Sequence, residues 1–173
     1  MSNTCICLLK AVSKSKDALL RLDTILKGDD KEYFLTHIDD GFEMQAPRQD
    51  PKTGLWECLY SGAMRNSGAP AFESLTDDEK KITVPSTGAR LVAFDELCPK
   101  LDFGVEYWGE EEGCCFQEHY GMNRNGHIFA NEIVDWTLDW TDDDGNELDE
   151  PTVTGGFGDR YEQFTTLRTI YGK

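Results

Sequence analysis

The densest group of chemically active side chains is the acidic run at residues 142–147, which reads Asp-Asp-Asp-Gly-Asn-Glu. Clustered side-chain oxygens suggest a calcium loop. An EF-hand loop has a glycine at position six and carboxylates at positions one and twelve. If Gly145 takes position six, Trp140 falls at position one and Pro151 at position twelve. The spacing therefore argues against calcium and predicts a solvated hairpin tip.

The cysteines and histidines also lack the spacing of metal ligands. None of the six cysteines forms a Cys-x-x-Cys pair, which is a common signature of structural zinc sites. A hairpin at Asn125-Gly126 would point His119 and His127 to opposite faces, and His37 falls in a polar connection. We therefore predict no metal site and no cofactor, and we interpret the cysteines as reduced thiols.

The sequence also lacks side chains spaced for nucleophilic or acid–base catalysis. Cys115 and His119 would share a strand face, but side chains four residues apart on a strand lie ~13 Å apart, beyond hydrogen-bond reach. Glu110, Glu111 and Glu112 fall in an expected turn, where water screens their charge. Catalytic carboxylates are usually perturbed by burial or by a specific neighbour. No Walker A loop or Rossmann fingerprint is present, so we predict no catalytic residue.

Apolar spacing predicts the helices that would position these groups. Ser15 can cap a helix that runs to Leu26, and Gly28 follows it as a C′ glycine. The other predicted helical segments are a short piece at Asp30–Thr36, a single turn after a capping box of Thr76 and Glu79, a helix between Ser86 and Pro99, and a closing helix over Phe157–Tyr171.

Alternating apolar and polar residues predict the strands. The predicted strands are Cys5–Leu9, Phe42–Pro47, Leu55–Tyr60, Leu101–Tyr107, Cys114–Met122 and Ile128–Trp136, with hairpins at Asn125-Gly126 and Asp144-Gly145. The mixed order of helices and strands, with a three-strand meander, predicts an α+β fold. We expect its helices to pack on one face of an antiparallel sheet.

Length and hydropathy bound the class of protein. A chain of 173 residues fits a single domain, and it can bury enough surface to need no disulfide or metal. No stretch approaches the ~20 apolar residues of a membrane span. The N-terminus has a short apolar run without a preceding basic region or a small-residue cleavage site. We therefore expect a cytoplasmic protein.

Negative charge is concentrated in one part of the chain. The net charge is −16, and residues 101–159 contain sixteen acids and a single base, Arg124. Nucleic-acid binding draws most of its affinity from Lys and Arg at phosphates, so direct binding to nucleic acid is not expected. Two interpretations stay open: an interface for a cationic partner, or a solvated face that keeps the protein in solution.

Residues 85–130 resemble a known family. The matching features are a helix ending in proline, an alternating strand, an acidic turn and an Asn-Gly hairpin, at Pro99, Leu101, Phe103, Tyr107, Gly113, Phe116 and Asn125-Gly126. This pattern is similar to the YubB-type ferredoxin-like family of phage and plasmid proteins. The resemblance implies a ferredoxin-like antiparallel sheet and an origin in a mobile element. It implies no catalytic residues.

The leading hypothesis is a non-enzymatic acidic binding protein. It would block a basic, nucleic-acid-binding surface of a host protein as an inhibitor or nucleic-acid mimic. The predicted partner-binding residues combine carboxylates with one aromatic anchor: Trp108, Glu110, Glu111, Glu112, Asp139, Asp142, Asp143, Asp144 and Glu147. The alternative is a small metal-dependent hydrolase that uses clustered Asp and Glu carboxylates. A homodimer joined by sheet edges is compatible with either.

Overall fold

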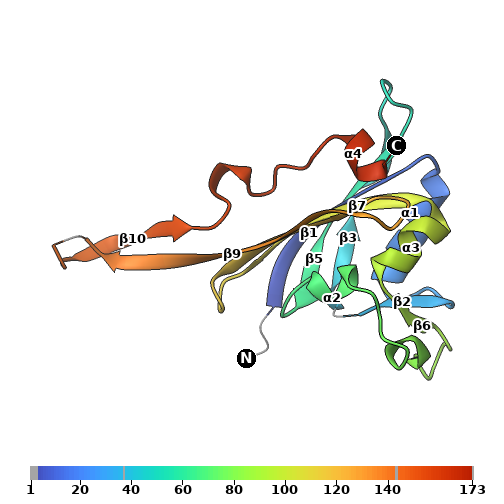
Figure 1. Ribbon diagram of the computed structural model, residues 1–173, viewed down its shortest axis with the longest axis horizontal. Coiled ribbons are helices and arrows are strands. Elements are labelled where there is room, and N and C mark those ends of the chain that lie inside the picture. The colour runs from blue at the N-terminus through green and yellow to red at the C-terminus, as the bar shows by residue number, and fades with distance from the viewer. Residues whose placement is uncertain (1–3, 37, 143, 173) are drawn as a thin grey trace.

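The computed structural model describes residues 4–36, 38–142 and 144–172. Its main feature is a large antiparallel sheet in the order β10-β9-β8-β7-β1-β5-β3, with β4 paired to β5 (Figure 1). Two short strands, β2 and β6, form a separate parallel pair. The α+β class and the antiparallel sheet predicted from the sequence are confirmed.

The strands and helices have the following bounds. The strands are β1 Thr4–Ser13, β2 Tyr33–Leu35, β3 Ile38–Met44, β4 Arg48–Gln49, β5 Trp56–Arg65, β6 Arg90–Val92, β7 Phe103–Glu111, β8 Phe116–Met122, β9 Ile128–Thr141 and β10 Glu147–Gly155. The α-helices are α1 Lys16–Leu26, α2 Ala69–Phe72, α3 Phe94–Leu101 and α4 Leu167–Tyr171, and single 3-10 turns lie at Glu79–Lys81 and Gly158–Arg160.

Strand β1 lies in the middle of the sheet, between β5 and β7. Its odd-numbered side chains from Cys5 to Ala11 are buried, and those of Cys7, Leu9 and Ala11 belong to the main core, as expected where side chains alternate between the faces of a strand. Helices α1 and α3 cover this face, which we call the helical face. The predicted helix α1 is confirmed: the Ser15 side chain accepts a hydrogen bond from the N–H of Ala18, and Gly28 follows with φ +74°.

Aromatic rings fill the part of the core between the short helices and strands β7 and β8. Phe72 lies 4.9 Å from Phe94 and 5.2 Å from Tyr120 between ring centroids, and 5.8 Å from Tyr107. Phe72 belongs to α2 and Phe94 to α3. These rings therefore fix both helices on the helical face of the sheet.

The opposite face of the sheet is covered by the C-terminal segment, residues 156–171. Helix α4 lies on this side in Figure 1, and Ile170 and Tyr171 form a second small core with Val12 and Leu55. The prediction that all helices pack on one face is therefore corrected. Val12 stands one residue out of phase with the buried odd-numbered residues of β1, so a second apolar layer was needed to cover it.

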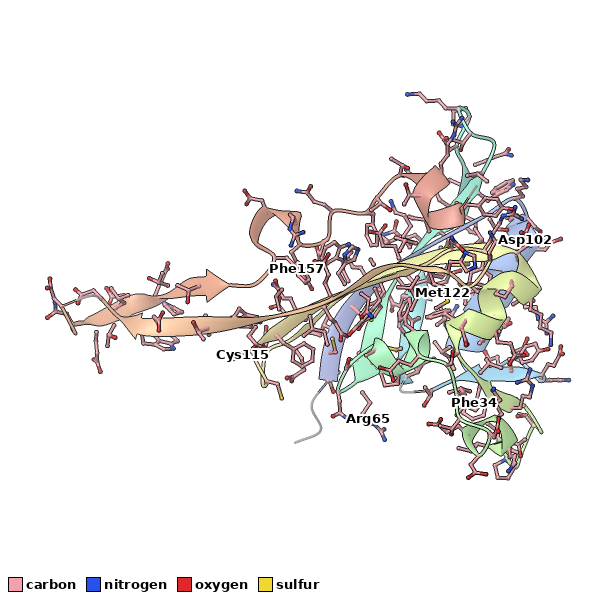
Figure 2. The ribbon with its side chains drawn as sticks, viewed as in Figure 1. Phe34, Arg65, Asp102, Cys115, Met122 and Phe157 are labelled. Atoms are coloured by element: carbon pink, nitrogen blue, oxygen red, sulfur yellow. The ribbon has the colours of Figure 1, made fainter. Side chains whose placement is uncertain are left out.

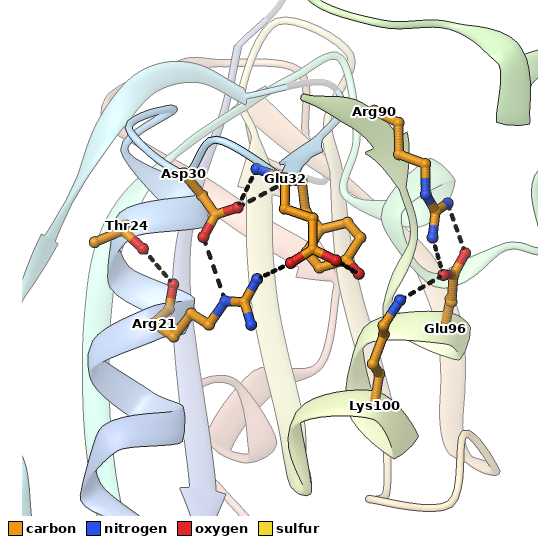
Figure 3. Close-up of polar contacts among 8 residues, drawn as sticks. Arg21, Thr24, Asp30, Glu32, Arg90, Glu96 and Lys100 are labelled. Atoms are coloured by element: carbon orange, nitrogen blue, oxygen red, sulfur yellow. Dashed lines mark hydrogen bonds and ion pairs between the residues drawn. The ribbon is translucent and has the colours of Figure 1, made fainter. Parts of the chain in front are cut away.

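A charged network joins α1, α3 and the β2–β6 pair (Figure 3). Arg21 on α1 donates to Asp30 at 3.3 Å and to Glu32 at 2.6 Å. Arg90 of β6 pairs with Glu96 of α3. These contacts pair bases with acids that all lie within residues 1–100, before the acidic C-terminal part of the chain.

Three predicted helical segments differ from the structure. The segment predicted as a helical piece at residues 30–36 forms β2, because Tyr33–Leu35 pairs in parallel with Arg90–Val92. The same pairing shortens the helix predicted to begin at Ser86, because Arg90–Val92 is extended and α3 begins only after Ala93. The predicted closing helix is helical only in the 3-10 turn Gly158–Arg160 and in α4. Tertiary pairing overrides local helical spacing in the first two cases.

The capping box is confirmed, since Thr76 and Glu79 exchange hydrogen bonds. His37 and Asp143 lie outside the described residues. Among the described helices, none is long and apolar enough to cross a membrane.

Candidate functional site

The most distinctive feature of the molecule is an arm that projects from the sheet (Figure 1). Strand β8 ends its pairing with β9 where Phe116 meets Asp135. Beyond that point β9 pairs only with β10, from Trp136 to Thr141. We call this two-stranded ribbon, residues 136–155, the β9–β10 arm. It forms because β9 is fourteen residues long and β8 only seven.

The tip of the β9–β10 arm is organised by Asp142. Its Oδ1 accepts hydrogen bonds from the N–H groups of Asp144 at 3.0 Å and Asn146 at 2.8 Å, and its Oδ2 accepts from Asn146 Nδ2 at 2.9 Å. Gly145 takes φ +84°, the left-handed conformation that such a turn requires. The hydrogen bond from Asn146 lowers the pKa of Asp142 below its ordinary value. The predicted hairpin at Asp144-Gly145 is confirmed.

The two faces of the β9–β10 arm differ in chemistry. One face carries Leu138 opposite Val153, with Trp140 further along; Trp140 is 55% exposed and Val153 62% exposed. The other face carries threonines: the hydroxyls of Thr137 and Thr154 lie 2.6 Å apart across the strands. Figure 2 shows the side chains of the arm standing free of the body. An exposed apolar stripe of this kind commonly marks a contact surface.

The charge of the β9–β10 arm is entirely negative. Its sequence contains seven acids and no Lys or Arg. Within the described part of the chain, no ion pair reaches Asp139, Asp142, Asp144 or Glu147, all of which are exposed. Carboxylates that are neither buried nor paired are free to meet a cationic partner. The structure therefore brings four of the predicted partner-binding residues together on one projecting element.

The remaining predicted carboxylates are not all in the turn expected at this place: Glu110 and Glu111 are the last two residues of β7, and Glu112 follows the strand. Glu112 is exposed. Glu110 accepts a hydrogen bond from Gln117 Nε2 at 2.6 Å. Glu111 is buried and accepts hydrogen bonds from the N–H groups of Gly113 and Cys114. Glu111 thus holds the turn together, and Glu112 is the freest of the three to meet a partner.

Trp108 is not the exposed anchor that the sequence suggested. It is 3% exposed, and its ring stacks on His119 at 3.7 Å between centroids with an interplanar angle of 5°. Phe157 of the C-terminal segment packs edge-on against it at 5.0 Å. Trp108 is therefore not part of the candidate surface. Among the described residues, the exposed large aromatic side chain is that of Trp140, which is 55% exposed.

The structure contains two buried carboxylates that the sequence did not indicate, Glu106 and Glu118. Glu106 lies beneath the C-terminal segment, where its Oε1 is 2.8 Å from His119 Nε2 and its Oε2 accepts hydrogen bonds from the N–H and hydroxyl of Thr165. The pair resembles an acid–base dyad, but Trp108 and Phe157 pack against the imidazole. This arrangement anchors the C-terminal segment.

The second buried carboxylate, Glu118, lies on the helical face. It accepts hydrogen bonds from the N–H of Gly68 at 2.6 Å, from Tyr107 Oη at 2.8 Å and from Ser67 Oγ at 2.5 Å. Burial raises the pKa of Tyr107 well above its ordinary value, so this phenol stays a neutral donor. Glu118 therefore ties the loop before α2 to the sheet.

Metal binding finds no support in the described residues. Among residues 4–36, 38–142 and 144–172, no group of three or more His, Cys, Asp or Glu side chains is placed to hold an ion. All six cysteines are free thiols, four of them buried.

No protein-family model, curated protein or solved structure matches the chain.

Proposed function

We propose that this protein is a non-enzymatic binding protein that docks its β9–β10 arm onto a basic surface of a partner protein. The observation that carries the proposal is the arm itself. It combines seven acids, no bases and an exposed apolar stripe on a ribbon that β8 does not support. Two-stranded ribbons are only marginally stable alone in water, so a partner that covers the apolar stripe would also stabilise the arm.

The chemistry of the arm favours a basic partner over a second copy of the chain. Two arms laid side by side would bring fourteen carboxylates together without a cation, and like charges at close range oppose association. A surface rich in Lys and Arg would gain from the same carboxylates. Trp140 would supply the desolvated centre of such a contact, with Leu138 on the same face of the strand, since tryptophan is enriched among the few residues that dominate binding energy at interfaces.

A nucleic-acid-binding surface is the partner class that best fits this charge. Such surfaces are clustered Lys and Arg side chains spaced to neutralise phosphates. A narrow acidic ribbon can enter a basic groove and occupy it. The proposal is therefore that the arm competes with nucleic acid for this surface and so inhibits the partner.

The ferredoxin-like assignment and the resemblance to YubB-type proteins belong to the same proposal. The strand order β7-β1-β5-β3, with α1 after β1 and α3 before β7, supports a ferredoxin-like core in which β1, β3, β5 and β7 are the four strands. An origin in a phage or plasmid would suit an inhibitor of a host protein.

The test is capture of the partner from a lysate of the host, followed by displacement with DNA. A triple variant, Asp139→Asn, Asp144→Asn and Glu147→Gln, removes three exposed charges and leaves the turn residue Asp142 intact. We expect wild-type protein to capture a basic protein at 50 mM salt and to lose it at 500 mM, because exposed charges are screened at high salt. Double-stranded DNA should displace it, and the triple variant should capture less than about a tenth as much.

The matched control removes three exposed charges elsewhere, by Asp29→Asn, Asp77→Asn and Asp78→Asn. Asp77 and Asp78 make only exposed ion pairs, which contribute little to stability. If the control variant loses the partner as fully as the arm variant, net charge rather than the arm is responsible. If DNA leaves the captured protein bound, the arm does not occupy a nucleic-acid-binding surface.

A further inference from the structure

Strand β9 has an edge that no described strand covers between Ile128 and Asp135. On one side this stretch pairs with β8. On its other side β10 begins to pair only at Trp136. We call residues 128–135 the β9 free edge. An uncovered edge offers a row of unpaired N–H and C=O groups to another strand.

Two hydrogen bonds determine which groups of the β9 free edge point outward. The N–H of Trp136 donates to the backbone of the β7–β8 turn at 2.9 Å, so this even-numbered residue faces β8. The C=O of Asp135 accepts from Gly156 on the far side, also at 2.9 Å. Because backbone groups alternate along an antiparallel strand, the N–H and C=O groups of Asn131 and Ile133 point outward.

The β9 free edge borders an apolar groove on the helical face. The groove has a volume of about 340 Å³, within the range of ligand-binding pockets. Phe72, Tyr120 and Met122 line it from α2 and β8. Ile128 and Ile133 line it from β9 and are 53% and 55% exposed. Two large aliphatic side chains thus stay in contact with water beside an unpaired strand edge.

The rim of the groove is acidic. Glu73 and Asp95 line it, and Ser74 Oγ donates to Asp95 at 2.6 Å. No Lys or Arg is among its lining residues. A second copy of this groove would bring only further carboxylates, because Glu73 and Asp95 are its charged lining residues, whereas a basic segment would complement both. Charge therefore favours a basic occupant.

We propose that the β9 free edge and its groove bind an extended, basic segment of a partner protein by strand addition. Outward backbone groups of Asn131 and Ile133 would pair with the segment. Its alternate apolar side chains would enter the groove, and its Lys or Arg side chains would lie beside Glu73 and Asp95. The edge and the groove carry this inference without the β9–β10 arm, so it stands or falls separately from the proposed function.

The first test uses a fluorescent nine-residue peptide of alternating Lys and Val, titrated with the full-length protein and followed by anisotropy. Two further peptides carry N-methyl groups on alternate residues, in opposite phases. Strand addition uses the N–H groups of every second residue. We expect one N-methylated phase to lose at least tenfold in affinity and the other to lose less than threefold. A peptide of alternating Glu and Val should not bind.

The second test changes the protein at a single outward N–H group. Ile133→Pro removes that donor without removing a hydrogen bond to β8, as proline is tolerated on an edge whose N–H faces solvent. Ile133→Thr is the matched control, since it keeps the N–H group and a β-branched side chain. We expect at least a tenfold loss of affinity for Ile133→Pro and less than a threefold loss for Ile133→Thr. Near-ultraviolet circular dichroism checks that both variants remain folded.

Several results would overturn the inference. Equal binding of both N-methylated peptides would mean that backbone pairing is not involved, and this result does not depend on any variant. Equal binding of the Glu-Val peptide, or no binding of the Lys-Val peptide at 1 mM, would remove the basic occupant. A dimer in sedimentation analysis that Ile133→Pro converts to monomer would assign the edge to a second copy of the chain.

Discussion

Glu106 Oε2 and the backbone N–H of Thr165 lie 2.8 Å apart and join β7 to the C-terminal segment across 59 positions of sequence. The same oxygen also accepts from the Thr165 hydroxyl at 2.9 Å. Glu106 is fully buried. A buried carboxylate is tolerated where hydrogen bonds satisfy it, so this side chain and the segment that covers it depend on one another.

Replacing Glu106 with Gln should therefore destabilise the protein and release its C-terminal segment. The carboxylate places one acceptor oxygen against Thr165 and a second against His119, whereas the amide has a single acceptor oxygen and no negative charge. We expect a loss of about 2–4 kcal/mol in the free energy of unfolding, measured by urea denaturation. Hydrogen exchange at Thr165 should quicken. Glu110→Gln, on the same face of β7, is the control and should cost less than about 1 kcal/mol; an equal cost would contradict this role for Glu106.

Gly104 should not tolerate a side chain. A Cβ at this position would lie 1.8 Å from the carbonyl oxygen of Ile170, so Gly104→Ala must push α4 away from the sheet. We expect a loss of about 1–3 kcal/mol and faster hydrogen exchange in α4. Gly41→Ala provides the comparison, because nothing lies within 4 Å of its Cβ position. Unchanged exchange in α4 would show that the helix is not held by this contact.

The tip of the β9–β10 arm should loosen in acid. The pKa of Asp142 is lowered by its hydrogen bond from Asn146, so the ionised form favours the folded turn. This contribution is complete above the ordinary aspartate pKa of ~4 and is lost as the pH falls through the lower, folded value. Carboxyl chemical shifts from NMR should show Asp142 titrating below the ordinary aspartate pKa of ~4.

Asn146→Ala removes the largest cause of this shift. We expect the pKa of Asp142 to rise toward its ordinary value in this variant. The pKa of Asp50, which is lowered by the hydrogen bond from Thr53 in a separate turn, should not change. If Asp142 titrates at the same pH in both proteins, the side chain of Asn146 does not hold the turn.

The thiols should differ sharply in reactivity. Cys114 is exposed, whereas Cys5 and Cys98 are buried and burial raises their pKa values. The hydrogen bond to Glu111 also raises the pKa of Cys114, which lowers the fraction of reactive thiolate at pH 8. We expect Cys114 to be alkylated well before the buried thiols, as followed by peptide mass spectrometry.

Glu111→Gln should then speed the alkylation of Cys114, because the loss of the negative charge lowers the thiol pKa. The pH–rate profile of Cys114 should move to lower pH, while Cys98 stays unreactive in the folded protein. A profile that does not move would mean that Glu111 leaves this thiol unaffected.

Turn residues and alternating apolar residues predicted the meander of β7, β8 and β9 well. They failed for strands whose pairing partner lies far away in the sequence. The hairpin at Asn125-Gly126 and the strands around it follow from turn residues and alternation, and β7, β8 and β9 confirm them. The connection is longer than a two-residue loop, because Met122 pairs with Ile128. The strand β6 was missed because its partner, β2, lies more than fifty residues earlier. Its apolar residues have helical spacing, and only parallel pairing draws them into an extended conformation.

The candidate surface was predicted only in part, because some of its features also depend on segments that are distant in sequence. The acidic residues of the β9–β10 arm follow from composition, but their projection follows from the unequal lengths of β8 and β9. The burial of Trp108 depends on Phe157, which arrives from the far end of the chain. The aromatic residues of the C-terminal segment were a visible signal that it would cover something, although not what.

The path of the chain after the β9–β10 arm has one further consequence. β10 continues directly into the segment that carries Phe157, Thr165 and Ile170 to the body of the protein. A single cut at the arm tip, between Asp144 and Gly145, would therefore give two pieces that remain docked without a peptide bond. The last 29 residues would behave as a ligand of the rest, so the two pieces, expressed separately, form a split protein whose reassembly can be measured.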